Sequence, residues 1–318
     1  MTSIGYHCSH EQFAPSELLR LVSEAERAGF ACAKSSDHFH PWSERQGQSG
    51  FAWSWLGAAM QATKFGFGMI SAPGYRYHPA VLAQAAATIG EMFPDRLWLA
   101  LGTGEAINEA VTGEYWPEKA ERNARLRECV DIFRALFDGE TVTHRGRVTV
   151  VEAKLYTRPQ KPLPIFGAAV TPATAAFCGQ WADGLLTTGG ELEKVRRVIE
   201  AFRENGGGSK PVHVQHALSW ARDENEALAE ALDQWSAPSV GGEAAWDLRR
   251  PGDFDTVGSM VTEDIIRKCV AISSDPERHR ADIDGLVALG PTAIHLHCVG
   301  RNQHAFIDMA ANHLVSVG

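Results

Sequence analysis

The chain has 318 residues, of which 44% are hydrophobic, 22% are charged and 9% are aromatic. This composition is typical of globular proteins and excludes disordered, collagen-like and coiled-coil classes. The 39 Asp and Glu residues outnumber the 30 Lys and Arg residues and give a net charge of −9. An overall basic field that would attract nucleic acid is therefore excluded.

The N-terminal residues and the cysteines indicate the compartment. The chain begins without a cationic stretch followed by an apolar core, and its six scattered cysteines form no Cys-x-x-Cys pair. The longest uncharged stretch, 162–182, is interrupted by prolines and glycines, so no membrane-spanning helix is expected. We therefore expect a cytoplasmic protein with reduced thiols.

Short apolar runs alternate with amphipathic segments along the chain, which indicates repeated strand–helix units. Three helix ends are recognisable, with Ser16 as an expected cap, Pro79 at a favoured first position and Gly139 as a terminator. Eight runs are predicted to form strands, namely Ile4–His7, Ala31–Ser35, Phe65–Ile70, Arg96–Leu101, Pro164–Gly167, Gly184–Thr187, Val212–Leu218 and Ala293–Cys298.

The number of these units predicts the fold. Consecutive units favour parallel pairing with right-handed crossovers, so eight of them predict a (β/α)₈ TIM barrel, an α/β fold, as a single domain over 1–318. The alternative is a doubly wound open sheet, which requires a Gly-rich turn after the first strand. Residues 7–11 read His-Cys-Ser-His-Glu, and this favours the barrel.

Two segments are additional to the eight strand–helix units that a barrel requires. Residues 141–156 have the pattern of a β-hairpin, with His-Arg-Gly-Arg at the turn. Residues 221–262 are marked by Gly and Pro and contain a helical stretch over 227–235. We expect both to be insertions near the C-terminal mouth of the barrel.

Barrel enzymes build their sites from the loops that follow the strands, and two of these loops have reactive side chains. The loop after the second strand contains Asp37, His38 and Trp42, a set that can orient, protonate and stack on a planar ligand. The loop after the fourth strand contains Thr103, Gly104 and Glu105. Its glycines permit close approach of a ligand to the backbone, and Glu105 is a candidate acid/base partner of His38. The alternative for this loop is a plain helix N-terminus.

Three further turns extend this site. The apolar end of the third strand, 68–74, is expected to lie under a flat ring, and Arg76 beyond it is either an anion ligand or a solvated rim residue. The small residues of 167–172 lead into a helix and predict a phosphate-binding N-terminus. The turn at 184–190 is of the same kind.

Histidine pairs raise the alternative of a metal-dependent hydrolase. His38 and His40 are two residues apart, and further pairs occur at 213–216 and 295–297. However, Pro41 redirects the backbone after His40, and no carboxylate follows the last strand. The late histidines are therefore expected to be buried residues without a metal.

Four motifs together resemble a known family. The chain reads Ser-Asp-His-Phe-His-Pro-Trp at 36–42, Arg-Tyr-His-Pro-Ala at 76–80, Gly-Thr-Gly-Glu-Ala-Ile-Asn-Glu at 102–109 and Asn-Ala-Arg-Leu-Arg-Glu at 123–128. Over nearly its whole length it resembles the bacterial-luciferase-like flavin oxidoreductases. It is most similar to the deazaflavin (coenzyme F420)-dependent glucose-6-phosphate dehydrogenases and to a sister group that uses an ordinary flavin.

The resemblance implies roles for individual residues. His38 and Glu105 would exchange protons around hydride transfer, and Trp42 would stabilise the reacting centre. A non-prolyl cis peptide would lie behind the cofactor ring near 69–70. The implied cofactor-binding residues are Asp37, Met69, Ile70, Ala72, Thr103, Gly104, Asn108, Ala169, Val170, Thr171 and Ala173, and Thr188 and Lys268 would lie on the substrate side.

The chain departs from the sugar-phosphate dehydrogenases where they bind the substrate phosphate. No lysine is present in the turn 188–191, and Glu191 there would repel a dianion. Residues 168–171 also lack the paired glycines of that family. Glucose 6-phosphate is therefore not expected as the substrate.

The sequence thus predicts an enzyme that transfers hydride between a small alcohol- or sugar-like substrate and FMN or coenzyme F420, and that acts as a homodimer. The main alternative is an FMN-dependent monooxygenase that uses separately reduced flavin. A metal-dependent hydrolase and a non-catalytic flavin-binding protein are further alternatives.

Overall fold

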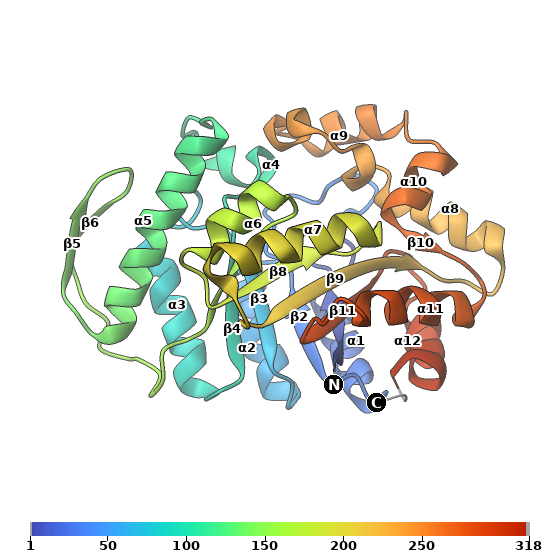
Figure 1. Ribbon diagram of the computed structural model, residues 1–318, viewed down its shortest axis with the longest axis horizontal. Coiled ribbons are helices and arrows are strands. Elements are labelled where there is room, and N and C mark those ends of the chain that lie inside the picture. Colours follow the sequence, from blue (N-terminus) through green and yellow to red (C-terminus); the bar gives the residue numbers. More distant parts are fainter. Residues whose placement is uncertain (1, 316–318) are drawn as a thin grey trace.

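The computed structural model describes residues 2–315 and has a closed barrel of parallel strands at its centre (Figure 1). Neighbouring strands follow the order β11-β1-β2-β3-β4-β7-β8-β9, and pairing of β9 with β11 closes the ring. The barrel strands are β1 (Ser3–Cys8), β2 (Cys32–Ser35), β3 (Phe67–Ser71), β4 (Leu97–Leu101), β7 (Ile165–Ala168), β8 (Gly184–Thr188), β9 (Val212–Ser219) and β11 (Ala293–Cys298). The predicted (β/α)₈ barrel is confirmed, and all eight strands lie within two residues of their predicted ends.

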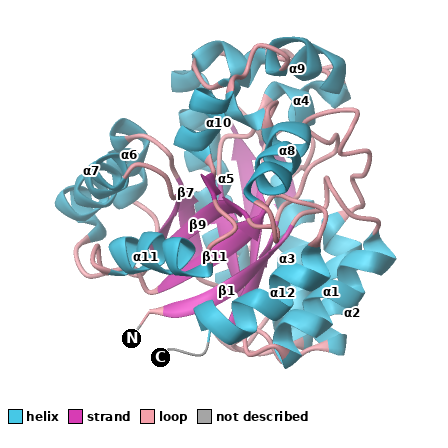
Figure 2. Cartoon of the chain, turned by 90° about the vertical axis from the view of Figure 1, so that its right-hand side faces the viewer, coloured by secondary structure: helices cyan, strands magenta, loops and turns pink. Residues whose placement is uncertain are grey.

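A ring of helices covers the outside of the barrel (Figure 2). Their apolar sides pack on the outward faces of the strands, and one continuous core results. The helices of this ring are α1 (Pro15–Arg27), α2 (Ala52–Ala62), α3 (Pro79–Met92), α5 (Lys119–Asp138), α6 (Pro172–Gly179), α7 (Leu192–Phe202), α11 (Pro276–Val287) and α12 (Gln303–Ala310). The helices α4 (Ala106–Glu109), α8 (Glu224–Trp235), α9 (Pro251–Gly258) and α10 (Glu263–Cys269) lie outside this core and pack in smaller clusters.

Two of the three predicted helix ends are correct. Helix α3 begins at Pro79, and α5 ends at Asp138 with Gly139 as its C-cap, whose φ of 90° is in the left-handed region that favours glycine. The predicted Ser16 cap is wrong, because α1 begins at Pro15 and its N-cap is Ala14, which makes no side-chain hydrogen bond. Proline fits the first helical position without any cap, since its missing N–H would have no partner there.

The first insertion forms the predicted hairpin, with β5 (Val142–Arg145) paired to β6 (Thr149–Ala153). It packs on the outer side of α5, at the left edge of Figure 1. There Glu128 of α5 pairs with His144 at 2.8 Å and with Arg147 at 3.0 Å. No residue of 141–156 borders the cavity described below. The hairpin therefore does not lie at the barrel mouth, where it was predicted.

Part of the second insertion borders the cavity at the mouth of the barrel. Helix α8 begins after Asp223, whose carboxylate accepts hydrogen bonds from two backbone N–H groups. Helices α8, α9 and α10 stand above the same end of the barrel, opposite the two chain ends (Figure 2). A short strand that the sequence analysis did not predict, β10 (Ala271–Ile272), follows and pairs with β9.

All six cysteines are free thiols. Within residues 2–315, no helix is both long and apolar enough to cross a bilayer. The cytoplasmic location and the homodimer stay predictions.

Candidate functional site

A cavity of about 1490 Å³ opens at the carboxyl ends of the barrel strands, where the sequence places the site. Loops after β2, β4, β7 and β8 line it, and the second insertion covers part of it. The predicted site residues that line the cavity are Asp37, His38, Trp42, Ile70, Ala72, Thr103, Gly104, Glu105, Asn108, Ala169, Val170, Thr171, Ala173, Thr188 and Lys268.

Met69 is the one predicted site residue that does not line this cavity. Its side chain is fully buried in the core between the strands and the helices. Successive side chains of a strand point to opposite faces, so Ile70 faces the cavity and Met69 cannot. The expected cis peptide near 69–70 is also wrong, because every peptide bond in the described part of the chain is trans.

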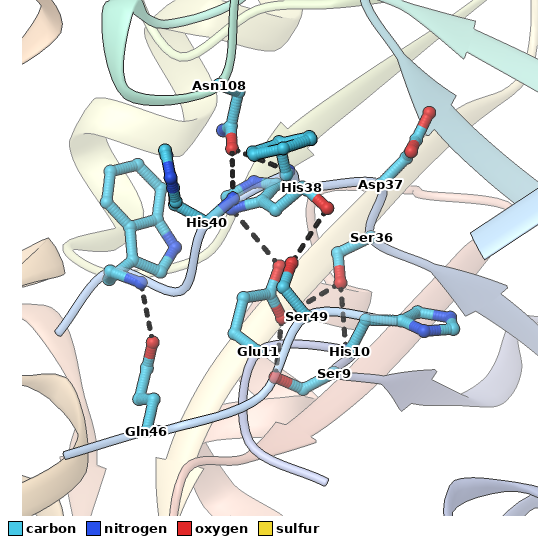
Figure 3. A network of polar contacts seen from close by, with 12 residues as sticks. Ser9, His10, Glu11, Ser36, Asp37, His38, His40, Gln46, Ser49 and Asn108 are labelled. Carbon is cyan, nitrogen blue, oxygen red and sulfur yellow. Dashed lines mark hydrogen bonds and ion pairs between the residues drawn. The ribbon is translucent and has the colours of Figure 1, made fainter. Parts of the chain in front are cut away.

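His38 borders the cavity and lies between two carboxylates, of which Figure 3 shows that of Glu11. Its Nδ1 is 3.2 Å from Oε1 of Glu11, and its Nε2 is 3.8 Å from Oε2 of Glu105. The Nδ1–Oε1 contact is short but not aligned as a hydrogen bond, and neither atom has another partner within residues 2–315. Each is therefore the natural partner of the other, and Nε2 is left facing the cavity.

Glu11 is almost completely buried, with an exposed fraction of 2%. Its Oε2 accepts hydrogen bonds from the hydroxyls of Ser9 at 2.8 Å and Ser36 at 2.9 Å (Figure 3). Burial alone raises the pKa of this carboxyl, but attraction by His38 and these hydrogen bonds outweigh burial and lower the pKa below its usual value. Glu11 is thus a fixed anion behind the imidazole.

Asn108 connects the two loops that supply His38 and Glu105. Its Oδ1 accepts hydrogen bonds from the backbone N–H groups of Phe39 and His40, at 2.9 and 3.2 Å. Its amide N–H donates to Oε2 of Glu105 at 3.1 Å. The distance between the imidazole and the second carboxylate is therefore set by one side chain.

Trp42 covers the imidazole from the side of the insertion. Its ring meets the His38 ring edge-on, with centroids 5.1 Å apart, and packs on Phe254 of α9 at 5.2 Å. The second insertion therefore helps to hold the aromatic wall of the cavity.

The carboxylate of Asp37 is saturated by the protein itself. It accepts hydrogen bonds from the hydroxyls of Ser71 at 2.6 Å and Tyr77 at 2.8 Å, and it lies 3.3 Å from Arg76. Its side chain has an exposed fraction of 0%, so only its backbone can meet a ligand. Arg76 also pairs with Glu109 at 3.6 Å, and its side chain is only 8% exposed. Both the anion-ligand and the solvated-rim interpretations of this arginine are therefore excluded.

The loop after β4 requires its second glycine. Gly104 has a φ of 73°, and a Cβ there would lie 2.6 Å from the side chain of Glu109. The backbone can therefore approach a ligand closely at this point. Next to it, the hydroxyl of Thr103 accepts a hydrogen bond from Lys119 at 2.9 Å.

The residues present fit a flavin-type cofactor. Val170, Thr171 and Ala173 border the cavity at the N-terminus of α6, where the helix dipole and backbone N–H groups favour a phosphate. Ile70 and Ala72 supply an apolar surface for a planar ring. The cavity volume also leaves room for a small substrate beside such a ring.

On the substrate side, Thr188 and Lys268 border the cavity. The nearby Lys194 is paired with Glu191 at 2.9 Å, so the turn after β8 offers no free cation. Within residues 2–315, no three His, Cys, Asp or Glu side chains gather as a metal-binding set. Of the late histidines, His216, His295 and His297 are buried, as expected.

Sequence reasoning missed Glu11, although a signal was present. The residue lies in the loop after β1, and loops after barrel strands are where site residues are sought. Residues 7–11 at the end of β1, His-Cys-Ser-His-Glu, combine an acid with two imidazoles. This combination at the end of a strand is the same signal that indicates His38 and Glu105.

Comparison with known proteins identifies the family to which the chain belongs. Residues 1–293 match the luciferase-like monooxygenase family, and the chain belongs to that family. It is 34% identical over 320 residues to an F420-dependent glucose-6-phosphate dehydrogenase of Mycolicibacterium gilvum, which covers 96% of this chain and 95% of the relative. A relative with the same name from Intrasporangium calvum is also 34% identical, covering 97% and 96% of the two chains.

Solved structures show the same fold. An F420-dependent secondary alcohol dehydrogenase, solved with an F420-acetone adduct, has a TM-score of 0.91 and 30% identity and covers 99% of this chain and 98% of its own. The F420-dependent tetrahydromethanopterin reductase of Methanopyrus kandleri has a TM-score of 0.79 at 21% identity, covering 99% and 98%. At that identity the second likeness concerns the fold alone.

Proposed function

We propose that this protein is an oxidoreductase that transfers a hydride between a small alcohol-like substrate and a bound coenzyme F420 or FMN. The observation that carries the proposal is the position of His38, between Glu11 and Glu105 at the floor of a cavity that can hold a flavin-type ring. The similarity to an F420-dependent secondary alcohol dehydrogenase and to F420-dependent sugar-phosphate dehydrogenases supports it. The bound cofactor would supply the hydride acceptor.

The chain's own residues would manage the protons. Because Nδ1 of His38 faces the carboxylate of Glu11, this nitrogen holds the proton of the neutral ring, and Nε2 carries the lone pair that faces the cavity. His38 would therefore remove the hydroxyl proton of an alcohol as the hydride leaves. Glu11 would stabilise the resulting imidazolium, and Glu105 would serve the second proton transfer.

The substrate is proposed to be an alcohol without a phosphate. The Lys194 ammonium near the turn after β8 is already paired with Glu191. On the same side Arg267 and Lys268 also border the cavity, but Arg267 is held by Glu263 and Glu224. A phosphate dianion requires several charge-assisted hydrogen bonds to leave water. Secondary alcohols should therefore be turned over faster than glucose 6-phosphate.

The direct test is titration of the purified protein with F420 and with FMN, followed by absorbance and fluorescence. Binding at about micromolar concentration is expected for one of them, and that cofactor should then be reduced by a secondary alcohol. Failure of both cofactors to bind would reject the proposal. Bound metal in a colourless protein would instead favour the hydrolase, and cofactor binding without turnover by any donor would favour a non-catalytic flavin-binding protein.

A second candidate is a monooxygenase that receives reduced FMN from another protein. The family match supports it. Rapid oxygen consumption by the complex with reduced FMN, together with no reduction of F420 by alcohols, would favour this candidate over the dehydrogenase.

A further inference from the structure

A lysine is enclosed inside the barrel, beneath the cavity. Lys34 has an exposed fraction of 0%. Its Nζ is 2.8 Å from Nδ1 of His7 and 2.5 Å from Oε1 of Gln215. His7 is its cross-strand neighbour on β1 and lines the cavity. A buried ammonium group without a hydrogen-bonded carboxylate destabilises the fold, so its presence requires an explanation.

A series of hydrogen-bonded side chains leads from Gln12 to Lys34, and the hydrogen bonds determine how each side chain in it is oriented. The carbonyl of Val299 can only accept, so Nε2 of Gln12 donates to it at 2.7 Å. Oε1 of Gln12 then accepts from Nε2 of His297 at 3.1 Å. Nδ1 of His297 therefore accepts from the amide of Gln215 at 3.2 Å. This leaves Oε1 of Gln215 to accept from Lys34.

The hydrogen bond from Lys34 likewise determines which ring nitrogen of His7 is protonated. In its ammonium form, Lys34 donates one N–H to Gln215 and another to Nδ1 of His7. Burial, and next the charge of Lys34, keep the pKa of His7 well below its ordinary value, so the ring is neutral. Its single proton is therefore on Nε2, which makes no hydrogen bond to any residue of the described chain. The cavity floor thus presents an N–H donor that is backed by a cation.

We propose that His7 and Lys34 form a second proton-donating pair at the cavity floor, separate from His38 and Glu105, that binds and neutralises an anionic acceptor atom on the polar edge of the cofactor ring. The proposal rests on the proposed function. In the transfer, the Nε2–H bond of His7 breaks as the acceptor–H bond forms, and one Nζ–H bond of Lys34 breaks as an Nδ1–H bond forms. A cation and an anion become two neutral groups, and no oxidant or reductant is needed.

The surroundings of Lys34 suit this role at neutral pH. Burial lowers the pKa of Lys34 from 10.5 to about 7, and the nearby Glu11 and Cys8 only partly oppose that shift. The remaining groups that face it are the rings of His7, His213, His295 and His297, whose pKa values are all lowered, chiefly by burial. Lys34 can therefore exchange its proton near pH 7.

The effect of Lys34 on the stability of the fold distinguishes a role in proton transfer from a purely structural role. Because the folded-state pKa of Lys34 is lower than its ordinary value, burial of this group destabilises the protein at any pH below about 10. Methionine is apolar and similar in length, so Lys34→Met should leave the midpoint of thermal unfolding unchanged or higher. A purely structural lysine would give a lower midpoint.

The test compares the affinities of the oxidised and the chemically reduced forms of whichever of FMN and F420 binds, at pH 6.5. Lys34→Met is expected to reduce the preference for the reduced, anionic form about tenfold, equal to one unit of pKa coupling. His7→Asn should reduce this preference by a similar factor. The Oδ1 of the asparagine can still accept the hydrogen bond from Lys34, but the shorter side chain does not reach the cavity. His279→Gln, which can keep the bond of that buried ring to the carbonyl of Ser273, is the control and should change nothing.

A second readout needs no cofactor. In the ligand-free wild type, ¹⁵N NMR should show that His7 is protonated at Nε2 at pH 6.5. In Lys34→Met this tautomer should no longer be the single form, because Nδ1 has lost its donor. If cofactor binds but neither the affinity ratio nor the tautomer changes, the proposal is wrong. If neither cofactor binds to the wild type, the proposed function fails as well, and that outcome is recognised in the first titration.

Discussion

The two sides of the barrel interior differ sharply in polarity. Strands β9, β11, β1 and β2 are consecutive around the ring and carry the hydrogen-bonded set of His7, Lys34, Gln215 and His297, of which Gln215 is half-buried and the others are buried. The four remaining strands, β3, β4, β7 and β8, carry an apolar cluster of Ile70, Trp98, Ala100, Phe166 and Leu186. Both sides are largely buried, so burial by itself does not explain the difference in polarity.

The apolar side is packed closely. The rings of Trp98 and Phe166 have centroids 4.8 Å apart, and Trp98 covers Gly68, where a Cβ would lie 2.1 Å from its ring. On the polar side, each hydrogen bond only offsets the cost of removing polar groups from water. We infer that the apolar side chiefly stabilises the fold, whereas the polar side is retained for chemistry. The following predictions test that division.

The largest effect is expected at His38. His38→Asn keeps an N–H that can face Glu11 but removes the lone pair at Nε2, so kcat should fall about 10²- to 10⁴-fold. The cofactor affinity and the midpoint of thermal unfolding should change little. His40→Asn is the matched control, since Asn can replace the donor that His40 offers to the carbonyl of Ile107. Comparable activity of the two variants would remove His38 from the mechanism.

On the apolar side, Phe166→Ala should reduce stability. The ring is 4% exposed and its loss leaves a cavity against Trp98, so the free energy of unfolding should fall by about 3–5 kcal/mol. Urea denaturation measures this change. Tyr156→Ala, at a ring that is 90% exposed, should change it by less than about 0.5 kcal/mol. A similar small value for Phe166 would contradict the stabilising role of this side.

A smaller effect is expected for the buried anion. Glu11→Gln removes the negative charge behind His38, and hydrogen bonds to charged groups contribute about 1.5–3 kcal/mol. The value of kcat should therefore fall about 10- to 100-fold, while KM should stay nearly constant.

The pH dependence of stability gives an independent check on Glu11. The folded-state pKa of Glu11 is below its ordinary value of 4.5. Its stabilisation is therefore fully present above that pH and is lost as the pH falls through the folded-state pKa. The stability difference between wild type and Glu11→Gln should disappear in acid, and a difference that stays constant down to pH 2 would show that the charge is not involved.

The smallest effect is expected at Met69. Met69→Leu conserves volume in the core and should cost less than about 1.5 kcal/mol, with no change in cofactor affinity. A clear loss of affinity would show that this side chain reaches the ligand after all. Ile70→Ala, at the neighbouring position that lines the cavity, should weaken cofactor binding instead.

The strands and the positions of the reactive loops could be predicted because they depend on local patterns. Apolar runs bounded by turns predict strands wherever they occur, and Asp37, His38 and Glu105 follow such runs directly. The orientation of individual side chains was less accessible. Met69 and Ile70 are equally apolar, and only the register of β3 in the barrel decides which of them faces the cavity.

The amino-acid sequence alone therefore determined the barrel, its strand ends and the loops that form the mouth, because these follow from periodicity and turn chemistry over a few residues. Only the tertiary structure decided that Glu11 faces His38, that Arg76 is enclosed by Asp37 and Glu109, and that Lys34 meets His7. Hydrogen bonds and ion pairs form between atoms that closure of the barrel brings together from separate strands and loops. Their partners are therefore not encoded in any local pattern.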